Sequence, residues 1–76
     1  MYQWSITYWT KSGNFIMGIY EGPENDSLSV MKKIINGKEN DFISHYGIDK
    51  DRMIGVRIGE IVSFEISKWN GETENG

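Results

Sequence analysis

Apolar and polar residues alternate from position 2 to position 8, which is the pattern of a half-buried β-strand. The even positions are large and apolar, namely Tyr2, Trp4, Ile6 and Tyr8. The odd positions 3, 5 and 7 are polar, and Trp9 then breaks the alternation. We therefore expect a strand over residues 2–10 whose even-numbered side chains face a core.

A second β-rich run follows over residues 15–21, and the Ser-Gly pair at positions 12–13 is typical of a turn. A two-residue loop at this pair fixes the register of the resulting hairpin. In that register Trp9 lies opposite Ile16, and Tyr20 shares their face. The sequence thus predicts a β-hairpin with one core face and, on its reverse, a patch made of Trp9, Ile16 and Tyr20.

A helical period follows the hairpin. Apolar residues recur three or four positions apart, at Leu28, Met31, Ile34 and Ile35, which gives an apolar stripe along one face of a helix. Asp26 or Ser27 can cap the N-terminus by accepting hydrogen bonds from free N–H groups. Gly37 is typical of the position just after a helix C-terminus. We expect the main helix over residues 27–36.

Residues 40–46 are interpreted as a second, shorter helical piece. Beyond it, apolar residues alternate at positions 54, 56 and 58 and again at 62, 64 and 66, which indicates two more strands joined over residues 59–61. The predicted fold class is α+β in the order ββα(α)ββ, a four-stranded antiparallel sheet with one main helix and a short helical turn on one face. Residues 1–69 are expected to form a single domain, and the polar residues 70–76 a disordered tail.

Size and composition exclude several classes of function. The chain has 76 residues, which leaves little interior for a substrate pocket beside a packed core, so we expect no enzyme. It has no cysteine, which rules out disulfides and thiolate metal sites. No signal peptide and no membrane-spanning run is recognisable, so we expect no membrane association and a cytoplasmic location. The net charge of −3 lacks the basic excess of nucleic-acid-binding proteins.

The titratable residues suggest no catalytic or metal site. His45 is the only histidine, and a catalytic triad or a zinc site needs further partners for it. We expect His45 to have a surface or packing role at the end of the short helix. Asp49 and Asp51 begin like a calcium-binding loop, but Met53 and Ile54 stand where an oxygen ligand and a glycine are needed. We therefore expect no catalytic residue, no metal and no cofactor.

The aromatic residues, 13% of the chain, are the strongest functional lead. An exposed patch of Trp9, Ile16 and Tyr20 would be typical of a binding surface. Three occupants remain open: another protein, a second copy of the chain in a homodimer, or the chain's own residues, among them Trp69. A different class of function would stack single-stranded nucleic acid on Trp9 and Tyr20, with Arg57 and nearby lysines contacting phosphates. The negative net charge makes nucleic acid the less favoured partner.

Several segments give the chain a resemblance to a known group of proteins. They are the hairpin with Lys11-Ser12-Gly13-Asn14, the helix, Asp41-Phe42 with Tyr46-Gly47, and the strand Val56-Arg57-Ile58-Gly59-Glu60-Ile61. Across residues 2–68 the chain resembles small orphan proteins of phages and prophages of Gram-positive bacteria. The stretch from Asp41-Phe42 to Tyr46-Gly47 and the strand after it are similar to the uracil-DNA glycosylase inhibitor of small Bacillus phages, an acidic, dimeric, non-enzymatic protein. The resemblance implies an accessory protein that binds a host protein, such as a host defence or nucleic-acid enzyme that it inhibits. It assigns no individual site residue.

Overall fold

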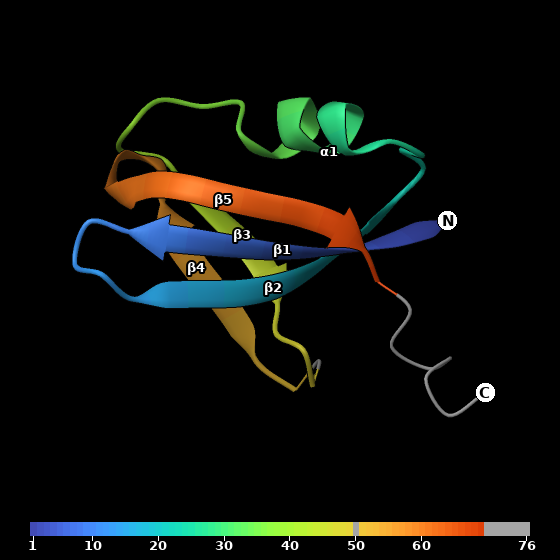
Figure 1. Ribbon diagram of the computed structural model, residues 1–76, viewed down its shortest axis with the longest axis horizontal. Helices are drawn as coiled ribbons and strands as arrows, with labels where there is room; N and C mark the ends of the chain where they lie inside the picture. Colours follow the sequence, from blue (N-terminus) through green and yellow to red (C-terminus); the bar gives the residue numbers. More distant parts are fainter. Residues whose placement is uncertain (50, 70–76) are drawn as a thin grey trace.

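The computed structural model describes residues 1–49 and 51–69. In chain order it contains β1 (Tyr2–Thr10), β2 (Phe15–Gly22), α1 (Ser27–Ile34), β3 (Phe42–Tyr46), β4 (Met53–Arg57), a 3₁₀ turn (Ile58–Glu60) and β5 (Ile61–Lys68). The described part is an α+β domain with one α-helix and a five-stranded antiparallel sheet in the order β4-β3-β2-β1-β5 (Figure 1). The predicted α+β class is confirmed, but the sheet has five strands where four were predicted. The predicted tail, residues 70–76, lies outside the described residues.

The sheet is bent into two layers. β1 lies in the middle of the first layer, where Ile6 pairs with Gly18 of β2 on one side and with Ile66 of β5 on the other. β3 and β4 form a hairpin that crosses behind these three strands in Figure 1. A single residue pair, Ile19 with Tyr46, joins β2 to β3. So short a junction lets the sheet turn sharply, and the inner faces of the two layers meet.

The hydrophobic core lies between the two layers and α1. Its buried members are Trp4, Ile6, Tyr8, Val30, Ile43 and Val56. β1 supplies the first three, so the predicted inward direction of Trp4, Ile6 and Tyr8 is confirmed. α1 lies beside β5 and closes the core from that side (Figure 1). Full burial of each such side chain contributes roughly 1.5–3 kcal/mol to stability.

The helix begins where the sequence predicts but buries a different side chain. The Asp26 carboxylate accepts hydrogen bonds from the backbone N–H of Ser29 at 2.8 Å and from its hydroxyl at 3.0 Å, which makes Asp26 the N-cap. The helix ends at Ile34, earlier than the predicted residue 36. Val30 is fully buried and Ile34 of the predicted apolar stripe packs against the core, whereas Leu28 of the same stripe is exposed.

Residues 40–46 do not form the predicted short helix, since Phe42–Tyr46 is strand β3. Ile43 and His45 point inward, while positions 42, 44 and 46 are exposed, which is the two-residue period of a strand. Aromatic residues at two outward positions hide this alternation in the sequence. Pairing decides the conformation, because Ile43 lies opposite Val56 and both become buried.

The loop between β1 and β2 has three residues, Lys11 to Gly13, where two were predicted. Gly13 has a φ of 90°, which glycine adopts without strain, and its N–H donates to the Thr10 carbonyl at 2.9 Å. The additional residue shifts the pairing by one position, so that Tyr8 lies opposite Ile16. A one-residue shift moves every side chain of β2 to the other face of the sheet.

The predicted hairpin between the two last strands is also wrong. β4 pairs with β3, and β5 pairs with β1, where Phe64 lies opposite Tyr8 and Ile66 opposite Ile6. The 3₁₀ turn carries the chain from one layer to the other. Alternation shows that both segments are strands, but it does not distinguish a neighbour in the sequence from a distant partner.

Candidate protein-binding surface

The structure does not bring the three predicted patch residues together on one face. Trp9 lies on the outer face of β1 and is 36% exposed. Ile16 and Tyr20 turn inward and pack against the core. The Tyr20 hydroxyl donates a hydrogen bond to Oε1 of Glu24 at 2.8 Å, and burial together with this contact raises the pKa of Tyr20. The three residues would share a face only if the β1–β2 loop had the two residues that were predicted, whereas it has three.

The observed register gathers a different set of side chains on the outer face. Trp9 pairs with Phe15 across β1 and β2, and Tyr46 pairs with both Ile19 and Met53. The exposed apolar residues around the buried Ile19 form what we call the outer apolar patch: Trp9, Phe15, Met17, Tyr46, Ile48 and Met53. The exposed fraction reaches 60% for Phe15 and 59% for Met53. Aromatic residues and methionine are the types enriched at protein interfaces.

A groove of about 430 Å³ runs through this patch between β2 and the β3–β4 hairpin. Its lining residues are Phe15, Ile16, Met17, Gly47, Ile48, Arg52, Met53 and Ile54. We call it the β2–β4 groove. Arg52 is the only charged side chain among these described lining residues. The groove therefore suits an apolar occupant, whose burial there would release water from apolar surface.

A buried tyrosine–histidine pair lies between the two layers of the sheet. Tyr8 Oη and His45 Nε2 are hydrogen-bonded at 2.7 Å, and the two rings stack with centroids 5.8 Å apart. Burial lowers the pKa of His45 and raises the pKa of Tyr8, so both groups are neutral near pH 7. His45 thus has a packing role, within a strand and away from any helix end.

His45 also lines a hollow of about 520 Å³ beside the end of α1, together with Lys33, Asp41 and Ser44. The Asp41 carboxylate is engaged by the backbone N–H of Lys38 at 2.9 Å. Among the described residues, Tyr8 is the only side chain hydrogen-bonded to the imidazole. No group of three or more His, Cys, Asp or Glu residues in the described part could hold a metal ion. None of the described residues that line the hollow is hydrogen-bonded to His45.

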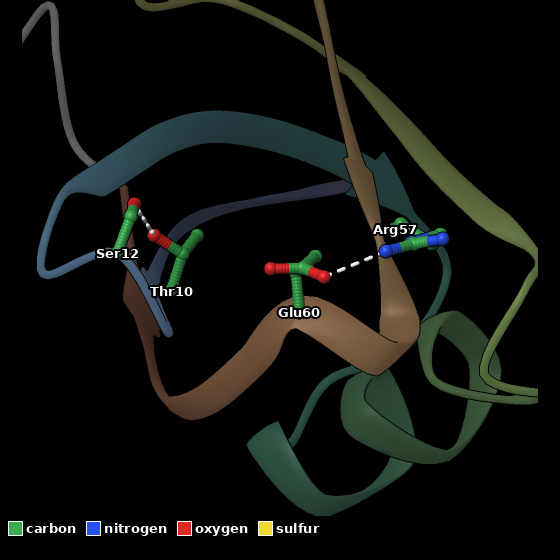
Figure 2. Close-up of polar contacts among 4 residues, drawn as sticks. All are labelled: Thr10, Ser12, Arg57 and Glu60. Atoms are coloured by element: carbon green, nitrogen blue, oxygen red, sulfur yellow. Dashed lines mark hydrogen bonds and ion pairs between the residues drawn. The ribbon is translucent and has the colours of Figure 1, made fainter.

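The arginine expected to contact phosphates is already paired. Arg57 Nη2 donates to Oε2 of Glu60 at 2.6 Å, and Figure 2 shows Glu60 between Arg57 and the β1–β2 loop. Where β1 enters that loop, the hydroxyls of Thr10 and Ser12 are 2.9 Å apart. Both charged side chains are substantially exposed, so the ion pair contributes less than about 1 kcal/mol to stability. It still neutralises the Arg57 charge.

Apart from Trp9, the members of the outer apolar patch were not predicted. Phe15 and Met17 would have been found with a three-residue loop, for which a glycine in the third position, Gly13, is the signal. Tyr46 and Met53 depend on recognising β3, and the alternation of inward residues around His45 is the only local sign of it. The patch residues that were not predicted therefore reflect two errors, one in the length of the β1–β2 loop and one in the conformation of β3.

In the part of the chain that the structure describes, no helix is both long enough and apolar enough to cross a membrane. Comparisons with protein-family models, with curated proteins and with solved structures found no match to this chain.

Proposed function

We propose that this chain is a non-enzymatic protein-binding domain that docks onto another protein through its outer apolar patch. The observation that supports the proposal is the patch itself, which spans both layers of the sheet and lies apart from the filled core. A contiguous apolar surface on a small domain is typical of an interaction site. Trp9 and Phe15, paired across two strands, offer the rigid aromatic anchors that dominate binding free energy in many interfaces.

The finer proposal concerns the partner. The sequence resemblance supports a host protein as the partner of a small phage-type accessory protein, including a host defence or nucleic-acid enzyme inhibited by the contact. A cytoplasmic location belongs to the same proposal. Both rest on the resemblance and on composition, while the docking surface rests on the geometry of the outer face.

Binding of single-stranded nucleic acid is the alternative that the geometry favours less. Trp9 and Tyr20 lie on opposite faces of the β1–β2 layer, so they cannot form one stacking platform. Arg57 is paired with Glu60, and the net charge is −3, which opposes contact with phosphates. We expect no salt-sensitive binding of single-stranded DNA in the sub-micromolar range by fluorescence anisotropy. Such binding would favour the alternative.

The proposal is tested by capture of proteins from a lysate of a Gram-positive bacterium with two matched variants. Phe15→Glu places a charge in the patch, and Leu28→Glu places one on α1 at a side chain of similar exposure, 56% against 60%. Thermal melts first establish that both variants fold. We expect a specific captured protein to be lost with Phe15→Glu and retained with Leu28→Glu. Retention by both variants, or loss with both, would contradict the assignment of the surface.

Sedimentation of the purified protein separates the two remaining occupants. A homodimer that Phe15→Glu dissociates would identify a second copy of the chain as the occupant of the patch. A wild-type monomer that captures a specific protein through Phe15 would identify a different protein as the partner.

A further inference from the structure

The two sides of β2 use their backbone hydrogen-bonding groups unequally. Successive residues of an antiparallel strand direct their N–H and C=O groups to alternate sides. The Thr10 N–H donates to the Asn14 carbonyl at 2.9 Å, so the even-numbered residues of β2 bond to β1 and the odd-numbered residues face away from it. On that far side β2 pairs with β3 only at Ile19. Phe15 and Met17 therefore have backbone groups without a strand partner in the described part of the chain.

These free backbone groups border the β2–β4 groove. Phe15 and Met17 both line the groove, and their side chains are exposed. An occupant of this groove must therefore satisfy N–H and C=O groups as well as cover apolar surface. An extended peptide segment does both, because it offers backbone groups to the strand and side chains at alternate positions. A helix has already used its backbone groups internally and does only the second.

The charged side chain in the groove lining adds a requirement on the occupant. Arg52 lines the groove and lies 3.8 Å from a carboxylate oxygen of Asp49. The side chains are 75% and 53% exposed, so this ion pair is weak and readily exchanged for another carboxylate. A carboxylate on the occupant, placed beside Arg52, would complement the only charged side chain of the described groove lining.

We infer that the partner protein presents an extended segment that adds as a strand to the unpaired half of β2, at Phe15 and Met17, in the β2–β4 groove. The segment carries apolar side chains at alternate positions and an acidic residue near Arg52. This inference rests on the proposed function, since it specifies how the partner binds to the patch. The added strand continues the first layer of the sheet past the point where β3 leaves it.

The test uses short peptides, selected from a random library against the whole protein, as probes of the groove. The tightest peptide is then N-methylated at one residue at a time, which removes one backbone N–H without changing the side chains. We expect methylation at every second residue to weaken binding about five- to tenfold, the loss of one hydrogen bond of roughly 1–1.5 kcal/mol. Methylation at the residues between them leaves the affinity nearly unchanged. In the complex, the amide protons of Phe15 and Met17 exchange with solvent more slowly than in the free protein.

Matched variants locate the peptide on the surface. Met17→Ala weakens the peptide complex and Leu28→Ala does not, and Arg52→Gln weakens only peptides that contain an acidic residue. Strand addition is overturned if methylation shows no two-residue period, if the Phe15 and Met17 amides gain no protection, or if no selected peptide is sensitive to Met17→Ala. None of these results removes the proposed function, which fails separately if Phe15→Glu captures the same proteins as the wild type.

Discussion

The two edges of β2 differ in how completely their backbone groups are paired with a neighbouring strand. Toward β1, the strand is paired from Phe15 to Gly22, and its inward residues join the core. Toward β3, it is paired at Ile19 alone, and Phe15 and Met17 remain exposed. We call the edge toward β1 the closed side and the edge toward β3 the open side. The difference shows how one strand can serve both stability and recognition. Substitutions of the inward residues, whose backbone groups point to the closed side, should act on folding, and substitutions of Phe15 and Met17, whose backbone groups point to the open side, should act on binding.

The largest effect is expected from Trp4→Ala, which empties a core position on β1, the strand that pairs with the closed side of β2. Trp4 is 3% exposed, and its Nε1 donates to the Glu24 carbonyl at 3.2 Å. Truncation of a buried aromatic residue costs roughly 3–5 kcal/mol, close to the whole stability of so small a domain. Urea unfolding should show a largely unfolded variant. A stable Trp4→Ala protein would mean that Trp4 contributes less to the free energy of unfolding than its burial implies.

A smaller loss is expected from Gly18→Ala, where β2 passes close to His45. A Cβ atom on Gly18 would lie 2.7 Å from the His45 Cβ and 2.9 Å from Cδ1 of Ile54, so the two layers would have to separate. Such overpacking costs typically 1–3 kcal/mol. Gly55→Ala is the matched control, because its nearest neighbour would be 3.8 Å away. Thermal melts should separate the two variants, and equal melting temperatures would show that the layers do not meet as closely as described.

Acidification should weaken the contact between the layers through His45. Burial lowers the His45 pKa below its ordinary value, so between the folded and unfolded values the unfolded chain binds more protons. Stability is therefore full above about pH 6.5, the unfolded value, and falls as the pH drops below it. The melting temperature should decline from about pH 7 to about pH 5 in the wild type. The decline should be absent from His45→Gln, and a parallel decline in both would assign it to other groups.

Asp26 provides an internal check on that pH profile. Its pKa is lowered by the hydrogen bonds from Ser29, so its contribution to stability is present above the ordinary value of about 3.9 and is lost as the pH falls below it. The two windows are distinct, and a loss of stability near pH 6 therefore cannot come from the helix cap.

The smallest effect on stability is expected from Phe15→Ala on the open side. Because Phe15 is 60% exposed, its truncation should change the free energy of unfolding by less than about 0.5 kcal/mol. Partner binding should nevertheless weaken by about 2 kcal/mol, the size of an interface hot spot. Urea unfolding and a binding titration on the same preparation measure both quantities. A variant that unfolds easily would place Phe15 among the residues that hold the sheet together.

The elements that could be predicted are those with a strong local signal. Alternation identified β1 and its core face, and the acidic cap at Asp26 identified the start of α1. β3 was missed because Phe42 and Tyr46 occupy outward positions, so that apolar residues run together and obscure the period. Its conformation is decided by pairing with β4, which no local pattern of residues 40–46 expresses.

The candidate site was harder to predict because it depends on register. A loop longer by one residue, with Gly13 at a positive φ, exchanges the faces of β2 and replaces Ile16 with Phe15 beside Trp9. The same error placed Tyr20 on the surface, whereas its ring meets His45 edge-on inside the domain. Trp9 was assigned to the outer face correctly because its position depends on β1 alone. The free backbone groups of β2 follow from tertiary structure and have no counterpart in the sequence.

The pairing of β1 with β5 also determines when this domain can fold during its synthesis. Trp4 lies opposite Lys68, so the central strand of the first layer lacks one flank until nearly all of the described chain has been made. At translation rates of about 5–20 residues per second, the β1–β2 hairpin precedes β5 by several seconds. During that interval the hairpin presents both its core face and its outer face to solvent or to a chaperone. The nascent hairpin therefore exposes apolar surface that the complete domain buries, which favours aggregation.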